Sequence, residues 1–149
     1  MTVFPEMMKE ALIEARRAAE AGEVPVGAVV AREGEIVSRA RNEVEESGRA
    51  SAHAELLALG RAAEALHTRS LTDCVLYVTM EPCPMCAGAC LNYRIGAVVF
   101  GAFDKAAGAL GSVMDIGSGA FGREIPAYGG FCEEECAKLL SDFFKDKRE

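Results

Sequence analysis

The sequence lacks several features that define large classes of protein. No stretch of the 149 residues approaches the roughly 20 consecutive apolar residues that span a bilayer. Residues 1–6 carry neither the basic segment nor the apolar run of a secretory signal. No internal repeat, low-complexity tract or Pro/Ser-rich linker divides the chain. We therefore expect one cytoplasmic domain, residues 1–149, with no membrane partner.

Positive charge is also scarce. The chain has 16 Lys and Arg against 23 Asp and Glu, which gives a formal net charge of −7. Because binding to a phosphate backbone normally leaves an excess of basic residues, this balance argues against a nucleic-acid partner. Apolar residues at 50% and charged residues at 26% are ordinary for a globular protein and exclude wholesale disorder.

Hydrophobic periodicity and turn residues predict an α/β protein. Helices are expected over residues 5–22, 52–66, 84–93 and 132–144, and buried strands over 75–78 and 97–100. Residues 24–31 and 36–40 are typical of an antiparallel hairpin, whereas 42–48 and 101–119 are typical of loops. Alternating helices and short buried strands imply a partly parallel sheet, whose site lies at the carboxyl ends of its strands. We therefore expect the chemistry just after residue 78.

The six cysteines are not expected to form a disulfide framework, because thiols inside a cell stay reduced. Only Cys83 and Cys86 have the C-x-x-C spacing of metal ligands together with a supporting context. The other four are interpreted as small buried apolar residues: Cys74, Cys90, Cys132 and Cys136.

Two short motifs predict a zinc centre: Ala-His-Ala-Glu at residues 52–55 and Glu-Pro-Cys-Pro-Met-Cys at residues 81–86. Zinc prefers thiolate sulfur and imidazole nitrogen, and three protein ligands leave the fourth position of a catalytic site open. The N–H groups at the start of the expected helix over 84–93 favour thiolates at Cys83 and Cys86. We predict one Zn²⁺ per subunit, bound by His53, Cys83 and Cys86.

Glu55 is predicted to be the catalytic residue. Zinc lowers the pKa of a bound water from about 15.7 to about 7. A carboxylate two residues from His53 can take that proton, pass it to a ring nitrogen and then protonate a departing amine. H-x-E followed by P-C-x-x-C is the established signature of zinc nucleobase deaminases.

A closed structural zinc site is the alternative. Cys90 lies four residues after Cys86, on the same face of the expected helix, and could be a fourth ligand. Such a site would have no room for an activated water, and the protein would be a binding module without activity. A structural site requires neither Glu55 nor Pro82, so the catalytic interpretation is favoured.

The chain resembles the bacterial tRNA-specific adenosine deaminases of the cytidine-deaminase-like superfamily. Besides the two metal motifs, the resemblance rests on residues 23–29 (EVPVGAV), 76–79 (LYVT), 94–102 (RIGAVVFGA), 111–115 (GSVMD) and 139–144 (LLSDFF). The metal motifs alone would indicate only the superfamily, and these segments favour the family. The resemblance implies a three-layer α/β/α fold, with a mixed five-stranded sheet and an N-terminal antiparallel hairpin.

The resemblance also implies a reaction: zinc-dependent hydrolysis of wobble adenosine 34 of an arginine tRNA to inosine. The enzyme would be a homodimer that uses both subunits to bind the tRNA anticodon loop. Asn42 would hydrogen-bond the flipped base, and Asp104 would contact a ribose of the loop. The terminal helix would help to hold the RNA through Phe143, Phe144, Lys145, Lys147 and Arg148; Phe144 and Lys145 are the contacts we select.

Other roles remain open for these residues. Asn42 could be a turn residue, Asp104 could cap a local turn, and Phe143 could simply pack in the core. The main functional alternative is a deaminase of a free base or nucleoside (guanine, cytosine or adenosine), which suits the charge of −7. If RNA is the substrate, basic residues should concentrate around the zinc site and the terminal helix, because binding needs only a local field.

Overall fold

The computed structural model describes residues 1–148 and contains a mixed five-stranded sheet. The strands are β1 (Gly27–Arg32), β2 (Glu35–Arg41), β3 (Cys74–Met80), β4 (Ala97–Ala102) and β5 (Ala127–Tyr128). Their order is β2-β1-β3-β4-β5; β1 is antiparallel to both of its neighbours, and β3, β4 and β5 are parallel. The expected mixed sheet with an N-terminal hairpin is confirmed.

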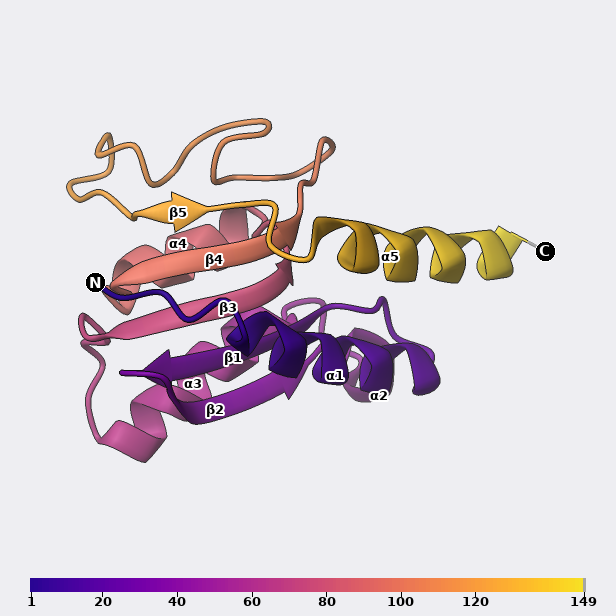
Figure 1. Cartoon of the computed structure of the whole chain (residues 1–149), viewed down its shortest axis with the longest axis horizontal. Coiled ribbons are helices and arrows are strands. Elements are labelled where there is room, and N and C mark those ends of the chain that lie inside the picture. Colours follow the sequence, from indigo (N-terminus) through magenta and orange to yellow (C-terminus); the bar gives the residue numbers. More distant parts are fainter. Residues whose placement is uncertain (149) are drawn as a thin grey trace.

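Helices cover both faces of this sheet (Figure 1). They are α1 (Met7–Glu20), α2 (Val44–Ser47), α3 (Ala54–Leu66), α4 (Pro84–Asn92) and α5 (Glu133–Arg148). α1 and α5 lie on one face, whereas α3 and α4 lie on the other, which gives the three layers expected. Because both faces are covered, residues 74–79 of β3 are all buried, and their sequence is an unbroken run rather than an alternation.

The crossover from β3 through α4 to β4 positions the site. β3 ends at Met80, and after a short connection Cys83 is the N-cap residue of α4, with Pro84 in its first turn. Proline suits this position because the first N–H groups of a helix have no partner within the helix. His53 is likewise the N-cap residue of α3, the neighbouring helix of the same layer.

The N-terminal hairpin has a tighter turn and a later first strand than expected. Its loop consists of Glu33 and Gly34, both with positive φ (51° and 79°), which is the backbone of a two-residue type I′ turn. β1 begins at Gly27 instead of residue 24. A Cβ at Gly27 would lie 2.1 Å from the carbonyl oxygen of Ala11, so the strand approaches α1 backbone to backbone at this residue.

Two elements were not expected from the residue pattern. α2 occupies a segment predicted to be a loop; the buried carboxylate of Glu23 accepts hydrogen bonds from the N–H groups of Glu45 (3.0 Å) and Glu46 (2.7 Å) at its start. β5 has two residues, paired with Val98 and Val99 of β4, and so short a strand has no periodicity to detect.

Three of the four cysteines interpreted as buried apolar residues are buried. All six cysteines are free, and Cys74, Cys90 and Cys136 are buried, whereas Cys132 is only partly buried. Within residues 1–148, no helix combines the length and the apolar character that crossing a membrane requires.

Candidate active site

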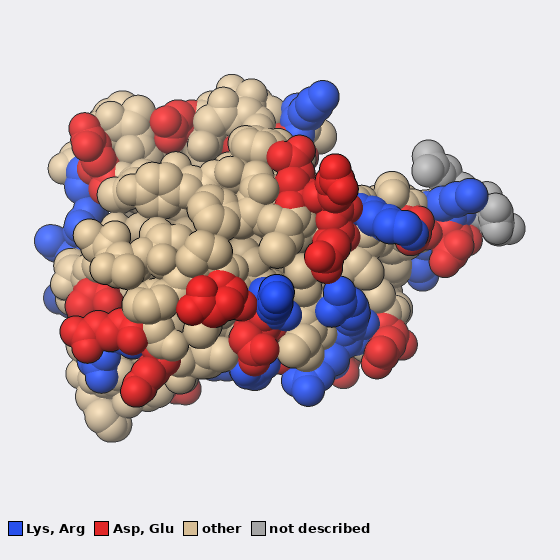
Figure 2. All heavy atoms as spheres, in the orientation of Figure 1, with Lys and Arg blue, Asp and Glu red and all other residues tan. Residues whose placement is uncertain are grey.

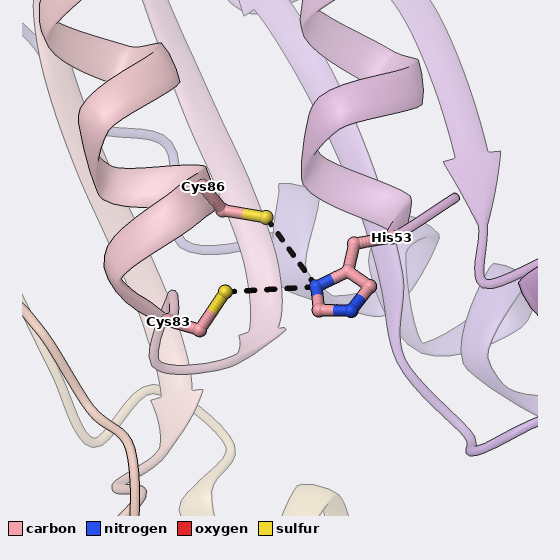
Figure 3. A group of neighbouring side chains, drawn as sticks. All are labelled: His53, Cys83 and Cys86. Carbon is pink, nitrogen blue, oxygen red and sulfur yellow. Dashed lines mark hydrogen bonds between the residues drawn. The ribbon is translucent and has the colours of Figure 1, made fainter. Parts of the chain in front are cut away.

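His53, Cys83 and Cys86 lie together at the ends of α3 and α4 (Figure 3). The Nδ1 atom of His53 is 3.6 Å from Sγ of Cys83 and 3.5 Å from Sγ of Cys86, and all three ligand atoms lie within 4.8 Å of one another. A tetrahedral zinc ion with bonds of about 2.3 Å to sulfur and about 2.0 Å to nitrogen separates these ligand types by about 3.6 Å. The three residues therefore fit a zinc ion in both donor chemistry and spacing.

The two thiols of the cluster influence each other's ionisation. The neighbouring Cys86 thiol lowers the pKa of Cys83 to about 4, and His53 assists. Proximity to Cys83, together with burial, raises the pKa of Cys86. Zinc is bound by thiolates, so metal binding at this cluster would release protons.

Cys90 does not complete the cluster. Among residues 1–148, no fourth His, Cys, Asp or Glu ligand atom lies within the mutual distance that unites the three. The Cys90 side chain is fully buried in the apolar core instead. Three protein ligands with an open fourth position are characteristic of catalytic rather than structural zinc.

Glu55 lies in the first turn of α3, two residues after His53, and its side chain is 4% exposed. Burial raises the pKa of this carboxyl to about 7, and the negative Cys83 adds to the rise while His53 opposes it. A carboxyl group with a pKa near neutrality both accepts and donates protons efficiently at pH 7.

One pocket of about 540 Å³ unites most of the predicted site residues. Its lining includes Asn42, His53, Glu55, Cys83, Asp104, Phe143, Phe144 and Lys147. A nucleobase needs only part of such a volume, so there is room for neighbouring groups of a larger substrate.

Asn42 has a structural contact in addition to its place in the pocket. Its side chain is 8% exposed, and Oδ1 accepts a hydrogen bond of 2.8 Å from the N–H of Ala54 at the start of α3. This residue therefore supplies the side-chain cap of that helix. Nδ2 of Asn42 has no hydrogen-bond partner in the described chain. Every fully buried side-chain nitrogen and oxygen there does have a partner, so Nδ2 is not fully buried and is accessible from the pocket.

Asp104 also combines two roles. It lines the pocket, and its Oδ1 accepts hydrogen bonds from the N–H groups of Ala106 (3.0 Å) and Ala107 (3.1 Å). The local turn that the sequence left open as an alternative is thus present, and it orients the carboxylate at the pocket wall.

The last turns of α5 close one side of the pocket. Phe143 and Phe144 pack edge to face with ring centroids 5.5 Å apart, and Lys147 Nζ lies 5.5 Å from the Phe143 ring centre. Lys145, one of the two contacts selected from the sequence, is exposed and lies outside the pocket lining. Phe144 and Lys147 are three positions apart, so these two share a helix face from which Lys145 is turned away. The side chain of Arg148 lies outside the described residues.

A profile of the MafB19-like deaminase family matches residues 4–148. The tRNA-specific adenosine deaminase of Bacillus subtilis (strain 168) is 48% identical over 149 residues, which cover 99% of this chain and 92% of that protein. The chain belongs to the tRNA-specific adenosine deaminases. The resemblance stated from its motifs is therefore confirmed.

Comparison with solved structures agrees with this family assignment. The structure of a tRNA:A34 deaminase matches it with a TM-score of 0.87 and 39% identity, covering 92% of this chain and all (100%) of the other. A guanine deaminase from Bacillus subtilis matches with a TM-score of 0.65 and 29% identity, covering 99% and 96%. The fold is shared with both, and the tRNA deaminase is closer by both measures.

The charge around the pocket of this deaminase differs from the expectation. The lining contains Glu23, Glu45, Glu55, Glu81 and Asp104, and Lys147 is its one basic member within residues 1–148. Figure 2 shows Lys and Arg interspersed with Asp and Glu over the face that it presents, including the end of α5. The expected concentration of basic residues around the site is thus wrong, in part because several of these carboxylates face backbone N–H groups within the protein.

Glu23 and Glu81 are the two residues of the site that sequence reasoning missed. Both are buried, at 1% and 2% exposure. Burial alone would raise the pKa of Glu81, but hydrogen bonds from the Ser112 hydroxyl and from several backbone N–H groups lower it overall. Its position at the carboxyl end of β3, directly before the cysteine motif, is the signal that could have singled it out.

Proposed function

We propose that the protein hydrolyses adenosine at wobble position 34 of an arginine tRNA to inosine, with one zinc ion per subunit bound by His53, Cys83 and Cys86. The observation that carries the proposal is this three-ligand cluster, two members of which, His53 and Cys83, line one pocket together with Glu55. Bound zinc supplies Lewis-acid activation of water at neutral pH.

Glu55 moves the protons of the reaction. Its carboxylate takes a proton from the attacking water and delivers it to N1 of the adenine ring as the oxygen adds to C6. The remaining hydroxyl proton then passes through the same carboxyl to the exocyclic amine. The C6–N bond breaks, ammonia leaves and the base becomes hypoxanthine, so that one water is consumed for each ammonia released.

Other pocket residues hold the substrate. The accessible Nδ2 of Asn42 donates to the flipped base, and Asp104 accepts from the 2′-hydroxyl of a neighbouring ribose. Phe144, 45% exposed at the pocket edge, offers a ring on which a base of the loop can stack. Lys147 interacts with a phosphate of the anticodon loop at the pocket, and Lys145, outside the lining, contacts the RNA beyond the pocket. A flipped base in a pocket with a few polar contacts does not require a basic protein.

The proposal extends to the assembly and its location. We expect two copies to associate, with both contributing to the RNA site, and the enzyme to act on tRNA in the cytoplasm. Sedimentation equilibrium of the zinc-loaded protein tests the assembly, because a monomer at every concentration would contradict it.

Deamination of a free base is the second candidate, favoured by the acidic pocket lining and by the shared fold of the guanine deaminase. The test compares four substrates: an anticodon stem-loop with a wobble adenosine, free adenosine, cytidine and guanine. We expect inosine in the stem-loop and no product from the free compounds. Rapid turnover of a free base without any in RNA would refute the tRNA assignment.

A Glu55→Gln variant tests the proposed mechanism in the same assay. It keeps the shape of the side chain and loses the proton carrier, so turnover should fall by about 10²–10⁴-fold. Zinc content, measured by atomic emission, should remain at one ion per chain. Undiminished turnover in this variant would overturn the role of Glu55, whereas loss of the zinc would show that Glu55 supports the metal site instead.

A further inference from the structure

Glu81 is a buried carboxylate whose oxygens are both occupied by donors from one distant segment. Oε1 accepts hydrogen bonds from the N–H of Asp104 (3.1 Å) and from the hydroxyl of Ser112. Oε2 accepts from the N–H groups of Leu110 (3.1 Å) and Ser112 (3.0 Å). All four donors are N–H or O–H groups of residues 104–112, which lie 23–31 positions further along the chain.

The segment that Glu81 holds has little regular structure of its own. Residues 103–126 contain neither helix nor strand, although Leu110 and Asp115 form an isolated bridge. Outside Glu81, the N–H of Ala109 donates to the carbonyl oxygen of Pro82 (2.9 Å), which ties the segment to the same short connection between β3 and α4. The position of the segment thus depends on the residues directly before the cysteine motif.

The packing at Gly108 shows how closely this carboxylate fits. A Cβ at Gly108 would lie 2.4 Å from Cδ and 2.5 Å from Oε1 of Glu81, and 2.5 Å from the carbonyl oxygen of Asp104. Because the last of these is backbone, the collision cannot be relieved by moving a flexible side chain alone. Glycine at residue 108 is therefore required for the carboxylate to reach its donors.

We infer that Glu81 is a positioning residue for substrate recognition: it fixes residues 104–112 and so holds Asp104 in the lining of the pocket that also contains His53 and Cys83. Its four donors leave no oxygen free to exchange protons with substrate, so Glu81 is not a second proton carrier. The metal ligands themselves are placed by the starts of α3 and α4. Loss of the carboxylate should therefore weaken binding of the RNA more than it slows the chemical step.

This inference rests on the proposed tRNA deamination, and a Glu81→Gln variant tests it. Glutamine offers one acceptor oxygen, and its amide N–H groups would face donors of the segment, so at least one backbone N–H loses its partner. We expect KM for the anticodon stem-loop to rise by about tenfold or more, with kcat within about threefold of the wild type. Zinc content should stay at one ion per chain.

Hydrogen exchange gives a readout that does not depend on activity. The amides of residues 104–112 should exchange faster in Glu81→Gln, whereas those of α3 should be unchanged. If the wild type shows no activity on the stem-loop, the proposed function fails, and faster exchange would still establish the structural anchor. An increase in KM without any change in exchange would overturn the inference, as would a fall in kcat at constant KM.

A second variant approaches the same contact from the other side. Gly108→Ala keeps the Glu81 side chain but forces its carboxylate away from the segment, so it should reproduce the increase in KM. Gly60→Ala is the matched control, since the nearest atom to its new Cβ, the Tyr93 hydroxyl, would be at an ordinary 3.8 Å. We expect the control to keep wild-type KM, and equal effects of the two substitutions would overturn the role of the Glu81 contact.

Discussion

Asn42 joins a structural contact to a predicted substrate contact, and two substitutions separate them. Asn42→Ala removes the acceptor for the buried N–H of Ala54 and also the amide that faces the pocket. Asn42→Asp keeps an acceptor oxygen for Ala54 but has no N–H to donate. A carboxylate at the start of α3 is also compatible with the helix dipole.

The size of the effect on stability follows from the single hydrogen bond. Loss of a side-chain cap costs about 1 kcal/mol, and an N–H left buried without a partner costs about 1–3 kcal/mol. We take about 2 kcal/mol for Asn42→Ala, which lowers Tm by about 4–8 °C in a chain of this size. Asn42→Asp should lose less than about 1 kcal/mol.

Activity should show a different order. We expect both variants to lose kcat/KM on the stem-loop by about tenfold or more, because each lacks the donor to the base. Thermal denaturation and steady-state kinetics measure the two properties on the same preparations. Asn92→Ala, at an exposed residue at the end of α4, is the control and should change neither. Full activity in Asn42→Asp would refute the substrate contact, and an unchanged Tm in Asn42→Ala would refute the capping argument.

The remaining predictions concern packing, recognition, metal and pH. Gly27→Ala should destabilise the fold by about 3 kcal/mol or more, because its Cβ would be 2.1 Å from the Ala11 carbonyl; urea denaturation checks this, and a smaller loss than about 1 kcal/mol would contradict it. Asp104→Asn should reduce the preference for RNA over DNA stem-loops, since an amide N–H replaces an acceptor for the 2′-hydroxyl; an unchanged ratio of rates counts against the contact. Chelation of zinc should abolish turnover and make two more thiols per chain reactive, counted with Ellman's reagent before and after reloading. Burial raises the pKa of Cys74 to about 11 from an unfolded value of about 9. The stability gained from its neutral thiol is therefore fully present below pH 9 and is lost as pH rises through 11. In Cys74→Ala the free energy of unfolding should fall less steeply over this alkaline range.

The features that the sequence predicted correctly are those with a local signal. The two motifs led us to expect His53, Cys83 and Cys86 in one cluster, and the structure brings them together because each lies at or near a helix start. The main helices and strands followed from their periodicity, since the sheet is covered on both faces.

The features that were missed depend on contacts between distant residues. Glu23 reaches a helix more than 20 positions away, and Glu81 reaches a segment 23–31 positions away. The place of Glu81 after β3 could have marked it as a site residue, but nothing local in the sequence shows that the carboxylate of Glu23 or of Glu81 is buried and hydrogen-bonded to backbone N–H groups. The acidic pocket lining was missed for the same reason, because net charge does not distinguish internal anchors from surface charge.

The anchoring of the pocket lining separates two tasks of a deaminase, which are metal binding and substrate selection. The ligands sit on two helix starts, whereas the lining residues Val44, Glu45 and Asp104 belong to segments that are tied by Glu23 and Glu81. A library aimed at a different base should therefore randomise these three lining residues and leave the carboxylate anchors and the cluster intact. Variants from such a library can differ in the substrate that enters the pocket, while Glu55, the three predicted ligands and therefore zinc binding stay unchanged.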